Sequence, residues 1–178
     1  KVSNFGIELN GKLRFSNISI FLPNLNFSYT NLSTEIVDGE IASNIKAGGA
    51  IADLKGNELP YAPKNTLNIG LESIGSKKIS FRVDLKYVSE VYTDFENIET
   101  TGNKGIKGPV PSYFIYNISS RYNFNSNISI FCSGKNITDE IYIGSRLHSN
   151  PGQEDANVSS GILPGPRRQI NFGIEYLF

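Results

Sequence analysis

The sequence predicts an all-β fold in which long antiparallel strands form part of a transmembrane β-barrel. Apolar and polar residues alternate along most of the 178 residues, and this period of two is typical of a strand with two different faces. The connections alternate between short and long, as the periplasmic turns and extracellular loops of outer-membrane barrels do. No apolar run approaches the roughly 18 residues that a transmembrane helix requires.

The alternation divides the chain into about seven strands of about nine to fifteen residues, against the roughly nine to eleven that cross a bilayer. One face is apolar. Its predicted members, in chain order, are Phe5, Ile7, Leu9, Leu13 and Phe15; Leu25, Phe27 and Tyr29; Leu67, Ile69 and Leu71; Ile79, Phe81, Val83, Leu85 and Tyr87; Phe114, Tyr116, Ile118, Tyr122 and Phe124; Ile128 and Ile130; and Ile170, Phe172, Ile174, Tyr176 and Phe178. The opposite face is polar and is expected to meet a wet interior, with charged members Arg82, Asp84, Lys86, Arg121 and Glu175. Phe131 breaks the alternation, because it falls on the polar face.

The connections have a rhythm of their own. Short ones are predicted at residues 21–24, 75–77 and 124–127, and long ones at residues 38–63, 94–111 and 144–166. Loops of this length are uncommon in a compact domain unless they serve a function. Ligand recognition is therefore expected on the long, Gly-, Pro- and Asn-rich loops.

A soluble β-sandwich is the competing fold, because its strands also alternate and bury one face against a second sheet. Sandwich strands usually run about five or six residues, however, and these are longer. Strand length and loop rhythm together favour the membrane barrel.

Composition excludes some classes of protein. The formal net charge is zero, so no nucleic-acid partner is expected. Cys132 is the sole cysteine, which precludes an internal disulfide, and we interpret it as a small apolar filler on a strand. The chain begins at Lys1 without an initiator Met or a signal peptide, and bacterial single-chain barrels have even strand counts. We therefore expect either a processed chain or a piece of a larger protein, and the odd count of about seven strands favours the piece.

No catalytic constellation stands out, and the chain is expected to be neither an enzyme nor a cofactor protein. Serines lack the Gly-x-Ser-x-Gly context, and no phosphate-binding glycine motif follows a strand. His148 lies in a loop beside Arg146, Glu154 and Asp155, without the ligand spacing of a metal site, so we expect no metal there.

Five segments resemble motifs of the TonB-dependent receptor family, in the family's order. Residues 133–142 contain Asn-Ile-Thr-Asp-Glu-Ile-Tyr, similar to the family's Asn-Leu-Phe/Thr-Asp-x-x-Tyr. Residues 161–167, Gly-Ile-Leu-Pro-Gly-Pro-Arg, are similar to the Pro-Gly-x-Pro-Arg that opens the last strand. The other similar segments are residues 4–8, 59–71 and 111–124. The chain departs from the family in Ile137 and Thr138, where Leu and Phe are commoner, and in a second Arg after Arg167.

This resemblance implies that residues 1–178 are the C-terminal segment, about seven strands, of a 22-stranded barrel in the bacterial outer membrane. It implies a plug domain and a TonB-contacting segment elsewhere in the protein, with uptake of an iron chelate, a siderophore or a ferric citrate-like compound, powered by the TonB complex. The Ser145-Arg146 pair after Tyr142, with the late Pro-Gly-Pro-Arg, favours the ferric dicitrate branch.

Two groups of residues are assigned roles. Tyr142, Arg146, His148 and Arg167 surround the last long loop and are expected to bind the chelate, since the forked donors of arginine suit carboxylates. The same charges would also suit the boundary of outer-membrane lipid and lipopolysaccharide headgroups, and this alternative stays open. The last strand, residues 168–178, resembles the signal read by the barrel assembly machinery, carried by Phe172, Ile174, Tyr176 and Phe178. An ordinary edge strand that stops at Phe178 is the alternative for this segment.

Three other functions compete with uptake. A passive porin or an adhesin-type barrel shares the alternation but lacks a plug. A soluble β-sandwich binding module would fractionate without detergent. An enzyme has no specific feature in its favour.

Overall fold

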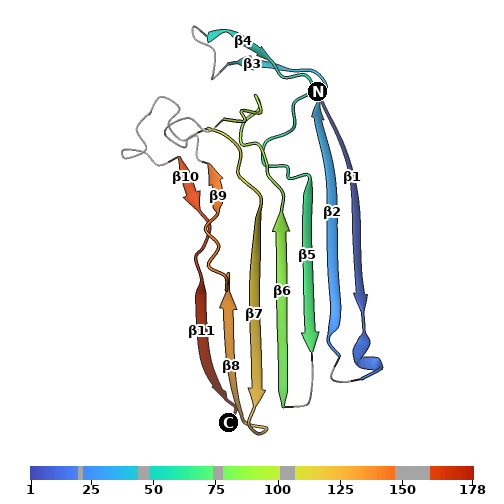
Figure 1. Ribbon diagram of the computed structural model, residues 1–178, viewed down its shortest axis with the longest axis vertical. Helices are drawn as coiled ribbons and strands as arrows, with labels where there is room; N and C mark the ends of the chain where they lie inside the picture. The colour runs from blue at the N-terminus through green and yellow to red at the C-terminus, as the bar shows by residue number, and fades with distance from the viewer. Residues whose placement is uncertain (20–21, 44–48, 74–77, 101–106, 147–160) are drawn as a thin grey trace.

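The computed structural model describes residues 1–19, 22–43, 49–73, 78–100, 107–146 and 161–178. Its main element is one seven-stranded antiparallel sheet in the order β1-β2-β5-β6-β7-β8-β11, whose strands lie side by side in a single layer in Figure 1. The strands are β1 (Val2–Leu13), β2 (Asn24–Ile36), β5 (Asn65–Ser73), β6 (Ile79–Val88), β7 (Tyr113–Asn123), β8 (Ile128–Lys135) and β11 (Gln169–Tyr176). The predicted all-β, antiparallel architecture is confirmed.

The strands run from 8 to 13 residues, so the two shortest, β8 and β11, fall below the predicted range. The first strand also ends earlier than predicted, at Leu13. Phe15 was expected on it but lies in η1 (Phe15–Asn17), a single 3-10 turn. Phe124 and Phe178 likewise lie beyond the ends of β7 and β11.

Two small hairpins lie beyond one end of the sheet, where the long loops gather (Figure 1). One pairs β3 (Glu40–Ala42) with β4 (Ile51–Asp53), and the other pairs β9 (Ile143–Arg146) with β10 (Ile162–Pro164). We call this the long-loop end and the opposite one the short-turn end. The described buried apolar residues are mostly near the long-loop end: Ile36, Ala52, Leu54, Val88, Ile98, Val110 and Ile115.

The register keeps the two faces of the sheet separate. Side chains of paired residues share a face, and apolar pairs such as Leu9↔Tyr29 and Val83↔Ile118 recur across the sheet. This apolar face is uncovered, with Phe172 still 77% exposed. A sandwich would need a second sheet against this face, and among the described residues the only strands outside the main sheet are those of the two small hairpins.

The polar face explains the misplaced Phe131. Its register partner is Gly173, and a Cβ added to that glycine would lie 2.2 Å from the Phe131 ring. The glycine therefore leaves the space that the ring occupies on the polar face. The guanidinium of Arg121 lies 5.6 Å from the centre of the same ring, a cation–π distance.

No helix in the described part of the chain has the length and apolar character needed to cross a membrane.

Candidate functional site

The long loops are hydrogen-bonded to one another, which makes the long-loop end a connected unit. The backbone N–H of Glu58 donates to Asn97 Oδ1 at 2.6 Å, and Asn97 Nδ2 donates back to the Glu58 carbonyl at 3.0 Å. Asn97 has φ 51°, a left-handed conformation that asparagine adopts more readily than most residues. The third long loop joins through Tyr61, whose hydroxyl donates to the Arg146 carbonyl at 2.6 Å.

Arg146, predicted to bind the chelate, lies at the end of β9 and is only 4% exposed. Its Nε and Nη2 donate to the carbonyl of Pro109 at 3.2 and 3.0 Å. Its backbone N–H donates to the Tyr61 hydroxyl at 3.1 Å. Burial lowers the pKa of the guanidinium, but arginine pKa values start so high that the charge remains. The side chain is therefore part of the packing between loops.

Tyr142 stacks against Tyr113, with ring centroids 4.4 Å apart and planes 28° from parallel. Its carbonyl accepts a hydrogen bond from Gly165 N at 2.8 Å. A Cβ on Gly165 would lie 2.1 Å from the Tyr142 ring, so the close approach requires glycine. Burial raises the pKa of the Tyr142 hydroxyl, which keeps the phenol neutral at physiological pH.

Arg167, the third predicted residue, is paired with an acid of the same segment. Its Nε and Nη2 donate to the two carboxylate oxygens of Asp139 at 2.9 and 2.6 Å, a bidentate pair. The backbone N–H of Arg168 donates to the same carboxylate at 2.9 Å. The Arg167 hydrogen bonds, followed by the Arg168 N–H, hold the pKa of Asp139 well below its usual range.

Two residues of the motif at residues 133–142, Asn136 and Asp139, make contacts that the motif alone does not predict. Asn136 is 3% exposed and has φ 48°. Its Nδ2 donates to the carbonyls of Glu140 and Pro166, at 2.9 and 3.0 Å, and its Oδ1 accepts from Glu140 N at 2.9 Å. Asp139, at φ 58°, follows in the same turn. The signal was present, since Asn and Asp are the residues that tolerate left-handed backbone.

Tyr142, Arg146 and Arg167 therefore all lie in the connection between β8 and β11. Each contacts different partners, so the three side chains do not converge on a common point. His148 lies outside the described residues. Phe172, Ile174 and Tyr176 lie on the apolar face of β11, and Phe178 follows the strand. No group of three or more potential metal-ligating side chains occurs within the described ranges.

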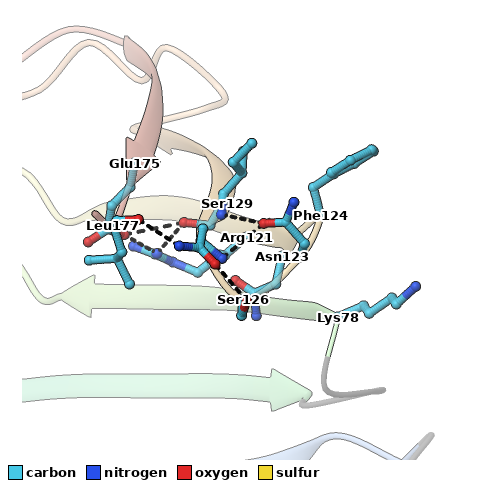
Figure 2. A pocket seen from close by; sticks show the side chains of 11 residues that line it. Lys78, Arg121, Asn123, Phe124, Ser126, Ser129, Glu175 and Leu177 are labelled. Carbon is cyan, nitrogen blue, oxygen red and sulfur yellow. Dashed lines mark hydrogen bonds and ion pairs between the residues drawn. The ribbon is translucent and has the colours of Figure 1, made fainter.

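The short-turn end has a hollow of about 480 Å³ on the polar face. Figure 2 shows Arg121 between Ser129 and Glu175, to which it donates hydrogen bonds at 2.8 and 2.5 Å. Asn127 lies in the turn between β7 and β8, and its Nδ2 donates to the Leu177 carbonyl at 2.8 Å. In return, the backbone N–H of Leu177 donates to the Asn127 carbonyl at 2.8 Å. Arg121 and Glu175 neutralise each other, and the turn between β7 and β8 holds the end of β11.

The family model for the TonB-dependent receptor-like β-barrel matches residues 1–137. This chain belongs to the TonB-dependent receptor family. The match covers β1 to β8, while the Asn136–Tyr142 motif and β11 lie mostly or wholly beyond it.

Solved TonB-dependent receptors have the same fold over nearly the whole chain. The ferric citrate transporter FecA, in its unliganded form, superposes with a TM-score of 0.74 at 19% identity, covering 99% of this chain and 24% of its own. The siderophore receptor PiuA of Acinetobacter baumannii gives 0.68 at 21%, covering 98% and 21%. The ferric yersiniabactin uptake receptor FyuA of Yersinia pestis gives 0.62 at 16%, covering 97% and 23%. At these identities the likeness shows the fold alone.

This chain spans only about a fifth to a quarter of the length of these solved receptors. No curated protein sequence matches it. The neighbours are receptors and transporters rather than enzymes, and receptors of this family are bacterial outer-membrane proteins.

Proposed function

We propose that this chain is the C-terminal part of the barrel of an outer-membrane receptor that takes up an iron chelate with energy from the TonB complex. The supporting observation is the seven-stranded sheet, with its long loops at one end, that superposes on receptors for siderophores and ferric citrate. The chain itself supplies barrel wall and extracellular loops. A plug and the TonB-contacting segment belong to the rest of the protein.

The two faces of the sheet give this proposal its geometry. The apolar face meets outer-membrane lipid, and the polar face, with Arg82, Lys86 and Arg121, meets the lumen and the plug. The long-loop end is extracellular and borders lipopolysaccharide. The barrel assembly machinery recognises β11 through the alternate residues Phe172, Ile174 and Tyr176 with Phe178.

The charge of the loops bears on which chelate is bound. The three long connections, residues 37–64, 89–112 and 136–168, contain twelve acidic and eight basic residues, a net charge of −4. Arg146 donates to a backbone carbonyl and Arg167 pairs with Asp139, so neither is poised toward an incoming anion. On this part of the rim we therefore favour a neutral or cationic ferric chelate over a polyanionic, ferric citrate-like one. Tyr142, Arg146, His148 and Arg167 remain the proposed surroundings of the chelate.

Growth on iron chelates tests this function. The full receptor is expressed in a bacterial host that has an outer membrane but lacks its own chelate receptors. The sole iron source is either a neutral hydroxamate chelate or ferric citrate. We expect growth on the hydroxamate chelate that disappears when the host's TonB is deleted. Equal growth with and without TonB would contradict energised uptake and identify a passive pore.

A further inference from the structure

The pairing of β11 with β8 poses a physical problem, because no tight turn joins the two strands. β8 ends at Lys135 and β11 begins at Gln169, which leaves 33 residues, 136–168, between them. By contrast, β7 and β8 are joined by residues 124–127 alone. In a hairpin the turn fixes the register of the strands. Here β9 pairs with β10 inside the connection, but seven residues separate β8 from β9 and four separate β10 from β11, so this pairing does not by itself fix the register of β11 on β8.

On the apolar face the side-chain pattern does not fix the register either, whereas on the polar face Phe131 opposite Gly173 is one contact that favours the observed register. A slip of one residue would reverse the faces of β11, but a slip of two residues restores them. In β11 the apolar positions are Ile170, Phe172, Ile174 and Tyr176, and the β8 residues on the same face are Ile128, Ile130, Cys132 and Gly134. A register shifted by two residues still places apolar residues opposite apolar or small ones.

A cluster at the long-loop end of this strand pair distinguishes these registers. We call it the clasp and define it as Asn136, Asp139, Tyr142, Gly165, Pro166, Arg167 and Arg168. Its members lie within seven residues after β8 and within four residues before β11. The clasp therefore acts at the two points where the long connection enters and leaves the sheet.

Asn136 forms the first part of the clasp. Its Nδ2 donates to the Pro166 carbonyl at 3.0 Å, across 30 residues of chain, and its backbone N–H donates to Asn117 Oδ1 at 3.0 Å. Buried at 3% exposure, it has both amide hydrogens and the amide oxygen in hydrogen bonds. A slipped β11 would carry Pro166 away and leave a buried N–H donor unpaired, which costs about 1–3 kcal/mol.

Asp139 forms the second part. It accepts both forked donors of Arg167 and the backbone N–H of Arg168, which is the residue directly before β11. A two-residue slip moves the chain by about 6–7 Å along the strand, well beyond hydrogen-bond reach. The bidentate geometry thus selects one position of the strand.

We propose that the clasp sets the register of β11 on β8, and that Arg167 is a positioning residue of the last strand. Because β11 is the outer strand of the described sheet, its register is passed on to whatever strand pairs with its other edge. Phe131 over Gly173 and Arg121 with Glu175 add contacts toward the short-turn end. The clasp is nevertheless the part that ties down both ends of the connection.

The lone cysteine makes the register measurable. Cys132 is the register partner of Phe172, and residues directly opposite in an antiparallel pair have Cα atoms about 4.5–5.5 Å apart, within disulfide range. In the full receptor, with any other cysteine changed to serine, F172C is expected to form the 132–172 disulfide under mild oxidation. I170C and I174C lie diagonally from Cys132 and are expected to stay reduced, but each would become its partner after a two-residue slip.

Clasp substitutions are then combined with each cysteine reporter in receptor that has folded in the outer membrane. With Asn136→Ala and Asp139→Asn we expect the 132–172 disulfide yield to fall several-fold and a new disulfide to appear at residue 170 or 174. Thr138→Ala, an exposed neighbour in the same segment, and Glu175→Gln, toward the short-turn end, are matched controls expected to keep the native pattern.

Unchanged 132–172 yield in both clasp variants, with nothing at 170 or 174, would overturn the proposal. Should Asn136→Ala give no folded receptor, Arg167→Gln and Asp139→Asn decide the matter, since both keep the buried amide. A native disulfide pattern in those two variants would equally overturn it. The readout needs no substrate, so it stands apart from the test of uptake.

Discussion

The apolar face of the sheet and the clasp at its long-loop end are stabilised in different ways. The face has no described protein layer over it, and Phe172 and Ile174 are 77% and 73% exposed, so its stability depends on the surrounding solvent. The clasp is specified by directional hydrogen bonds, with Asn136 at 3% exposure. A repeating pattern therefore suffices for the barrel wall, whereas the join to β11 requires particular residues.

Placing a charge on the apolar face is expected to have the largest effect. Phe81→Lys or Phe172→Lys should destabilise the inserted receptor by about 2–4 kcal/mol if the residue lies near the bilayer midplane, because lysine is poorly solvated there. Folding into lipid vesicles, followed by a denaturant titration, measures the change. Ser80→Lys is the matched control, since Ser80 is adjacent to Phe81 on the polar face. Equal losses at positions 80 and 81 would contradict the assignment of the faces.

Crowding the clasp is expected to cost somewhat less. Gly165→Ala would place a methyl group against the Tyr142 ring, where a Cβ has only 2.1 Å of room, and overpacking of this kind costs about 1–3 kcal/mol. The same denaturant titration applies. Tyr142→Ala combined with Gly165→Ala should cost less than the sum of the two single substitutions, because removing the ring removes the clash. If the losses of the two single substitutions simply added up, the contact between Tyr142 and Gly165 would not be the cause of the destabilisation.

The same contrast explains what the sequence predicted and what it did not. The alternation of apolar and polar residues predicted β6 and its two faces from local sequence alone, because the polarity of each residue indicates the face on which it lies. Phe131 looked like an error because its cause, Gly173, lies 42 residues away in the sequence. Arg146 and Arg167 were assigned to an anionic ligand from their chemistry. Their partners, the Pro109 carbonyl and Asp139, come from distant positions that no local pattern reveals.

Acid is expected to have the smallest effect, and a comparison with Asp139→Asn isolates its action on the clasp. The hydrogen bonds from Arg167, and then that from Arg168 N, lower the pKa of Asp139 in the folded chain below its ordinary value of about 4. A carboxyl with a depressed folded pKa adds stability above its unfolded pKa and loses it as the pH falls toward the folded value. The difference in unfolding temperature between the native receptor and Asp139→Asn should thus be constant from about pH 8 to 5 and shrink below about pH 4. Heat-modifiable gel mobility across this range measures it, and a difference that persisted unchanged at pH 3 would mean that the carboxylate charge contributes nothing to the clasp.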